Sequence, residues 1–140
     1  MADARDSKSR GSNTVSVRVR PPAPKRRVSM ESDCVFCKII SRKLPAEVIA
    51  EDDDILVIKD IAPKAPIHYL IMPKQHYKDL QDLDNCCVGA GMLMMAKRVA
   101  ETYPEAKDFK LVMNNGYNAG QRVFHLHMHF LAGPDLPGIV

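Results

Sequence analysis

The segment His125-Leu126-His127-Met128-His129-Phe130 alternates histidine with an apolar residue three times. Successive side chains of a β-strand point to opposite faces, so the alternation predicts a strand within residues 123–131 with all three imidazoles on one face. Leu126, Met128 and Phe130 would then fill the core behind them. Three imidazoles on one face are costly to bury without a purpose, because each ring nitrogen needs a partner. The pattern therefore predicts a functional site.

Two kinds of chemistry fit such a site. Three histidines can ligate a zinc ion. Alternatively, a neutral imidazole is a competent nucleophile toward phosphorus near neutral pH, and its neighbours can orient it and donate hydrogen bonds to phosphate oxygens. Just upstream, Gly116 and Gly120 would let backbone N–H groups approach an anion closely. The residue pattern alone leaves both interpretations open.

The surrounding sequence predicts an α+β domain. Apolar runs typical of strands occur at residues 55–58, 68–72, 109–113 and 123–131. A loop rich in Asn and Gly, residues 114–120, separates the last two runs. One long helix among strands that are mostly neighbours in sequence indicates a largely antiparallel sheet.

Two helices are expected. A short one spans residues 34–42, with Asp33 as its cap. A long one begins after a cap at Asp84 or Asn85 and reaches about Thr102. The apolar residues of the long helix recur at helical spacing and predict a buried stripe made of Val88, Met92, Met95, Ala96 and Val99.

Residues 1–30 differ in composition from the rest. They carry eight Lys and Arg against two Asp and are rich in Ser and Pro, which predicts a disordered basic leader before one folded domain over residues 31–140. Met30 is a possible alternative start. A basic tail on a mildly acidic body does not predict nucleic-acid binding. No apolar run is long enough for a membrane span. We expect a cytoplasmic protein, with the nucleus or an organelle as alternative locations.

The sulfur-containing residues suggest packing and metal binding rather than disulfides. The four cysteines form two close pairs, Cys34/Cys37 and Cys86/Cys87, unlike a secreted disulfide framework. Reduced thiols are therefore expected, and one pair could hold a metal. Met92, Met94 and Met95 fit a soft core or a dimer face better than a cofactor site.

The histidine-rich segment resembles the signature of the histidine triad family, in which three histidines alternate with apolar residues and two apolar residues follow. The folded region is similar to the branch of histidine triad nucleotide-binding proteins, also described as protein kinase C-interacting-like, from about residue 33 to 133. The supporting segments are Cys34 to Ile40, Asp60 to His68, Pro73 to His76, and Asn114 to Gln121. The resemblance implies a mostly antiparallel five-stranded sheet, one long and one short helix, and a two-fold homodimer.

The resemblance also implies roles for the histidines. His127 would attack the α-phosphorus of a nucleotide and form a nucleotidyl-histidine, which water then hydrolyses. His129 would lie close to the phosphate, His68 would join the hydrogen-bond relay that orients His127, and His125 would complete the catalytic set. Asp60 would accept hydrogen bonds from the ribose hydroxyls.

The resemblance places three further groups of residues. The purine slot would be formed by Phe36, Ile39, Leu44, Ile58 and Ile61. The phosphate pocket would be lined by Asn114, Gly120, Gln121 and Val123, together with His127 and His129. A structural zinc, not needed for catalysis, would be held by Cys34, Cys37, His76 and His125. Arg122 departs from the family pattern, because relatives often carry serine or an acidic residue there.

The implied activity is that of a purine nucleoside phosphoramidase, which releases AMP from a P–N bond or from an acyl-adenylate. Hydrolysis of dinucleoside polyphosphates is a second possibility, and a non-catalytic nucleotide sensor or scaffold is a third. The expected partners are an AMP-type nucleotide and a second copy of the chain.

Overall fold

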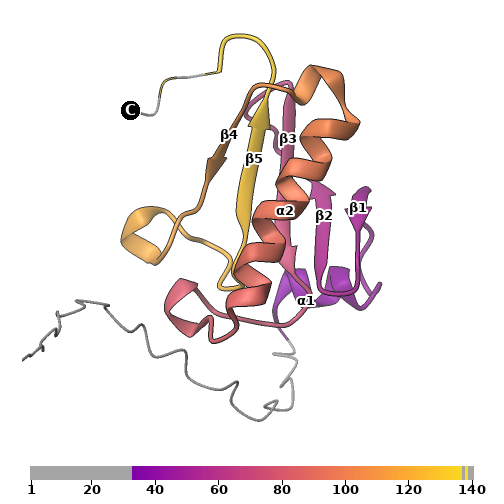
Figure 1. Cartoon of the computed structure of the whole chain (residues 1–140). Helices are drawn as coiled ribbons and strands as arrows, with labels where there is room; N and C mark the ends of the chain where they lie inside the picture. Colours follow the sequence, from indigo (N-terminus) through magenta and orange to yellow (C-terminus); the bar gives the residue numbers. More distant parts are fainter. Residues whose placement is uncertain (1–32, 137, 139–140) are drawn as a thin grey trace, which may run out of the picture.

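The computed structural model describes residues 33–136 and 138. The predicted leader over residues 1–30 and the alternative start at Met30 lie outside this range. The strands are β1 (Val48–Glu51), β2 (Ile55–Lys59), β3 (Ile67–Pro73), β4 (Phe109–Val112) and β5 (Met128–Ala132). They form one antiparallel sheet in the order β1-β2-β3-β5-β4 (Figure 1). Within the described residues, no helix is both long and apolar enough to cross a bilayer.

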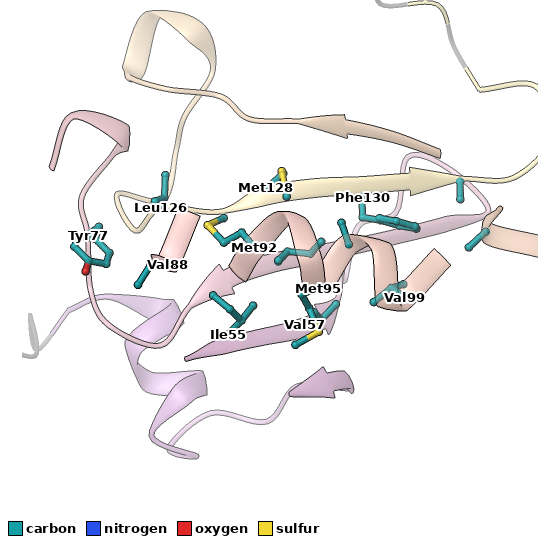
Figure 2. Packing of buried hydrophobic residues seen from close by; sticks show 14 residues of the cluster. Ile55, Val57, Tyr77, Val88, Met92, Met95, Val99, Leu126, Met128 and Phe130 are labelled. Carbon is teal, nitrogen blue, oxygen red and sulfur yellow. The ribbon is translucent and has the colours of Figure 1, made fainter. Parts of the chain in front are cut away.

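Helix α2 (Cys86–Thr102) lies across one face of the sheet (Figure 1). Asn85 caps it, with its side chain accepting a hydrogen bond from the Cys87 backbone N–H at 3.0 Å. The five residues of the predicted stripe are all buried. They pack against strand residues in one core (Figure 2). The prediction of this helix, its cap and its buried face is confirmed.

The two faces of the sheet carry different residues because side chains alternate along each strand. Ile55, Val57 and Ile71 belong to the core under α2, as do the predicted residues Leu126, Met128 and Phe130 (Figure 2). Their neighbours in sequence form a second cluster on the opposite face, made of Leu56, Ile58, Leu70 and Met72 with Phe36 and Ile39. The histidine side of the triad segment therefore faces away from α2.

Helix α1 (Val35–Ile40) covers part of this opposite face with the Phe36 and Ile39 side chains. It is shorter than the predicted span 34–42, and its cap is Cys34 rather than Asp33. The reason is local, since Cys34 Sγ accepts a hydrogen bond from the Cys37 backbone N–H at 3.4 Å.

The triad strand also begins later than predicted. Its ladder with β3 ends at the pair Ile71↔Met128, so residues 123–127 lie outside β5. Other groups take the hydrogen bonds that would extend the ladder. The Pro73 carbonyl accepts from His125 Nε2 at 2.8 Å, and the Leu126 N–H donates to the Tyr77 carbonyl at 2.7 Å. The start at residue 123 was therefore wrong, although the alternation of faces holds.

Candidate active site and metal centre

His127 is a buried imidazole whose tautomer is set by the backbone. Its Nδ1 lies 2.7 Å from the carbonyl oxygen of His125. A carbonyl can only accept, so Nδ1 carries the proton and Nε2 keeps its lone pair. Burial lowers the pKa of His127, against the opposing effect of this hydrogen bond. At neutral pH the ring therefore offers an uncharged nitrogen nucleophile.

His68 and His129 form a hydrogen-bonded pair beside His127. The Lys64 backbone N–H donates to His68 Nδ1 at 3.0 Å, so the proton of neutral His68 is on Nε2. That Nε2 lies 2.9 Å from His129 Nδ1 and 3.3 Å from a carboxylate oxygen of Asp60. His129 therefore accepts at Nδ1 and carries its own proton on Nε2.

Both histidines of this pair are neutral near pH 7. Burial lowers the pKa of His68, and burial together with the neighbouring imidazoles lowers the pKa of His129 to about 4. The His127 and His129 rings lie 5.2 Å apart between centroids. The site thus places a nitrogen lone pair beside a ring that can donate an N–H, which is the combination needed to attack a phosphorus atom and to stabilise its oxygens.

His125 has a different environment from the other two triad histidines. It is fully buried, and its Nε2–H donates to the Pro73 carbonyl at 2.8 Å. The lone pair of Nδ1 is therefore directed at Cys34 Sγ (3.5 Å) and Cys37 Sγ (3.6 Å). Cys37 Sγ is also 3.2 Å from His76 Nδ1. The structure thus brings together the four residues proposed as metal ligands, with all ligand atoms within 4.8 Å of one another.

This cluster fits zinc. Tetrahedral zinc with bonds of about 2.0–2.3 Å to sulfur and nitrogen places neighbouring ligand atoms about 3.3–3.8 Å apart. The three contacts above, at 3.5, 3.6 and 3.2 Å, lie in or close to that interval. The lone pair of His125 also points inward, as a ligand requires. A second group, Asp60, His68 and His129, is equally compact, but the proton on His68 Nε2 occupies the position that a metal would need.

The predicted purine slot is partly assembled. Phe36, Ile39 and Ile58 belong to one buried cluster, and the Phe36 ring meets the His127 ring edge-on at 5.1 Å. Leu44 and Ile61 are 40% and 100% exposed and lie outside that cluster.

Asp60 borders the site with both carboxylate oxygens engaged. One oxygen accepts from the Ala62 N–H at 2.8 Å, and the other faces His68. A shallow hollow next to it is lined by Glu47, Lys59, Asp60, Ile61 and Pro63. The carboxylate is thus held in place at the edge of an open depression.

The loop predicted to line the phosphate pocket is held by Gln121. The buried Gln121 amide donates to the carbonyls of Lys78 and Val123 and accepts from the Gly116 N–H. Asn114 packs beside Gly120, whose backbone is left-handed at φ 99°. The Gln121 side chain therefore shapes the loop from within.

Arg122 projects from the same loop and is exposed. Its guanidinium lies over the Tyr117 ring at 4.4 Å and donates to the carbonyls of Tyr117 and Gln121. It also borders a hollow lined by Asp33, Cys34, Val35, Arg122, Val123 and Phe124.

Several contributors to the site act through the backbone and were missed from the sequence. The Pro73 carbonyl and the Lys64 N–H set the tautomers of His125 and His68. The Tyr77 carbonyl holds the peptide next to His125. Every residue type except proline offers the same backbone donor and acceptor, so these contacts cannot be predicted from the pattern of side chains in the sequence.

Comparisons with known proteins agree with this geometry. The family model described as "HIT domain" matches residues 41–136. An uncharacterized HIT-like protein of Synechocystis is 43% identical over 107 residues, which cover 74% of this chain and 93% of that protein.

Two solved structures are similar over most of their length. A HIT family hydrolase from Clostridium thermocellum is 43% identical with a TM-score of 0.73, covering 78% of this chain and 98% of that one. A zinc-bound histidine triad family protein from Mycobacterium smegmatis is 35% identical with a TM-score of 0.68, covering 77% and 80%. The family model, the sequence similarity to these relatives and the shared fold agree. The chain therefore belongs to the HIT family.

Proposed function

We propose that this chain is a hydrolase that cleaves purine nucleoside 5′-phosphoramidates through a nucleotidyl intermediate on His127. The observation that carries the proposal is the tautomer of His127, whose Nδ1 proton is bound to the His125 carbonyl so that Nε2 keeps its lone pair. The similarity to a solved HIT family hydrolase supports the general class of reaction.

The reaction would proceed in two displacements. In the first, the lone pair of His127 Nε2 forms a bond to the α-phosphorus while the P–N bond of the substrate breaks, and the departing amine takes up a proton from solvent. In the second, water attacks the same phosphorus and releases a proton to solvent, the P–N bond to His127 breaks, and the nucleoside monophosphate leaves. His129, with its proton on Nε2, would donate to a phosphate oxygen in both steps.

The rest of the nucleotide would follow the surface beside His127. The purine would pack against Phe36, Ile39 and Ile58, with the exposed Leu44 and Ile61 closing over it. Asp60 would accept from the ribose hydroxyls. The phosphate pocket would be completed by Asn114, Gly120, Gln121 and Val123. The apolar slot thus suits the base, the carboxylate suits the ribose hydroxyls, and the imidazoles suit the phosphate.

A structural zinc held by Cys34, Cys37, His76 and His125 is part of the proposal. Its support is the spacing of the ligand atoms, the orientation of His125 and the zinc-bound relative from Mycobacterium smegmatis. Metal analysis of protein purified without chelator should give about one zinc per chain. A stoichiometry near zero would contradict it.

We also propose a homodimer formed through α2 and the edge strand β4. In the sheet order β4 is terminal, and Leu93 and Met94 on α2 are each 56% exposed. Exposed apolar side chains on a helix and an unpaired strand edge are both surfaces that a second copy can cover. The mass in solution by light scattering tests this directly.

The activity is tested by measuring AMP release from adenosine 5′-phosphoramidate and from diadenosine triphosphate. The wild type should cleave the phosphoramidate, and His127→Ala should lose more than about 10³-fold in kcat/KM. Lys107→Ala, an exposed position outside the site, provides the control.

Other outcomes would redirect the proposal. Cleavage of the triphosphate alone would assign the chain to the dinucleoside polyphosphate hydrolases and leave His127 as nucleophile. Binding of AMP without cleavage of either compound would favour a nucleotide sensor.

A further inference from the structure

We propose that the thiol pair Cys34/Cys37 positions the nucleophile His127, with His125 as the connecting residue. This inference rests on the proposed role of His127 as nucleophile. It extends that proposal because it gives the metal cluster a task in the reaction beyond holding the fold together.

The connection runs through one peptide unit, the one between His125 and Leu126. Its carbonyl accepts the Nδ1 proton of His127 at 2.7 Å. Its N–H donates to the Tyr77 carbonyl at 2.7 Å. The carbonyl and the N–H of this peptide are thus both hydrogen-bonded. The orientation of the peptide plane determines the direction of the carbonyl that holds the Nδ1 proton of His127.

The cluster holds this peptide from both sides. The His125 side chain is fixed between the Pro73 carbonyl at 2.8 Å and the two sulfur atoms at 3.5 and 3.6 Å. Tyr77, which binds the peptide N–H, directly follows His76, whose ring contacts Cys37 Sγ at 3.2 Å. Of the two imidazole ligands, His125 is therefore part of the hydrogen-bonded peptide. His76 directly precedes Tyr77, whose carbonyl accepts the hydrogen bond of that peptide.

The thiols reach His127 by a second route. Phe36 lies between Cys34 and Cys37 in sequence, and its ring meets the His127 ring edge-on at 5.1 Å with an interplanar angle of 81°. In this proposal, the thiols hold α1 against His125. Both the hydrogen bond from His127 to the His125 carbonyl and the contact between the Phe36 and His127 rings depend on this anchoring. Loss of the thiols should therefore loosen the orientation of His127 and let its proton move between the two ring nitrogens.

The chain provides a matched control for this idea. Cys86 and Cys87 are a second pair of cysteines, exposed at the start of α2 and outside the cluster. The same change, Cys to Ser at two positions, can thus be made inside and outside the cluster. Cys34→Ser/Cys37→Ser and Cys86→Ser/Cys87→Ser are compared in full-length protein, with thermal unfolding to verify folding.

The decisive readout is the tautomer of His127, from imidazole ¹⁵N chemical shifts at one neutral pH. The Cys86/Cys87 variant should keep a single Nδ1–H form, whereas the Cys34/Cys37 variant should show a mixture of the two forms. With the phosphoramidate, kcat of the Cys34/Cys37 variant should fall about 10–100-fold, with KM changing far less. If that variant does not fold, Cys34→Ser alone replaces it, because Cys34 is the less buried of the two.

A folded Cys34/Cys37 variant that has lost its metal but keeps the single tautomer and the kcat of the control would overturn the proposal. The cluster would then have a structural role only. The tautomer measurement does not depend on turnover. If the wild type fails to cleave the phosphoramidate, the proposed function fails, while the shifts still decide whether the thiols position His127.

Discussion

His127 and His129 are two residues apart, yet they carry their protons on different ring nitrogens. His127 is protonated at Nδ1 because it faces a carbonyl, and His129 accepts at Nδ1 because His68 donates to it. The first ring is therefore suited to attack and the second to donate. This division of roles comes from the partners of each ring, since the residue type is the same.

The burial of His129 predicts acid sensitivity. Burial and the adjacent imidazoles lower its pKa from 6.5 to about 4. Between these pH values the unfolded chain binds more protons than the folded protein. The contribution of His129 to the free energy of unfolding is therefore fully present above pH 6.5 and is lost as the pH falls toward 4.

Urea unfolding of metal-free protein between about pH 7.5 and 4.5 measures this effect. The free energy of unfolding should decline with acidification in the wild type and more gently in His129→Asn. Parallel curves for the two proteins would show that His129 does not titrate in this way.

At the scale of elements, α2 offers two adjacent methionines in opposite environments. Met95 is 1% exposed in the core, and Met94 is 56% exposed. Met95→Ala should reduce the free energy of unfolding by about 2–5 kcal/mol, because it leaves a cavity. Met94→Ala should change it by less than about 0.5 kcal/mol in the monomer. Equal losses for the two variants in chemical denaturation would contradict the packing described for this helix.

The elements show which parts of the fold could be read from the sequence. Helix α2 was predicted well because its stripe and its Asn85 cap are local signals. The start of β5 was predicted wrongly, because it depends on Pro73 and Tyr77, which are distant in sequence. The Pro73 carbonyl accepts from the His125 side chain, and the Tyr77 carbonyl accepts from the Leu126 N–H. Similarly, the cap of α1 is a thiol, whereas Asp33 is the stronger capping residue by general preference.

For the molecule as a whole, the sheet separates packing from chemistry. One face is closed by α2 and contains the larger core (Figures 1 and 2). The other face carries His68 and His129, the thiol cluster and the apolar residues proposed for the base. The alternation of histidine and apolar residues in the triad segment predicted this separation, because side chains of a strand point to alternate faces of the sheet.

The division of the histidines between two centres could not be read from that alternation. His125 and His127 differ only in what the folded chain places next to them. The ring of His125 meets Cys34, Cys37 and His76 from distant segments, and the ring of His127 meets Phe36. Only the resemblance to a known family suggested the metal set, and the structure brings its members together.

In the proposed reaction, His127 becomes covalently bonded to the nucleotide. The most direct measurement is a single-turnover reaction with radiolabelled adenosine 5′-phosphoramidate, quenched in alkali to preserve a P–N bond to histidine, followed by peptide mapping. Label should appear on His127 and decay during turnover, and His127→Ala should acquire none. Label on any other residue, or turnover with His127 unlabelled, would contradict it.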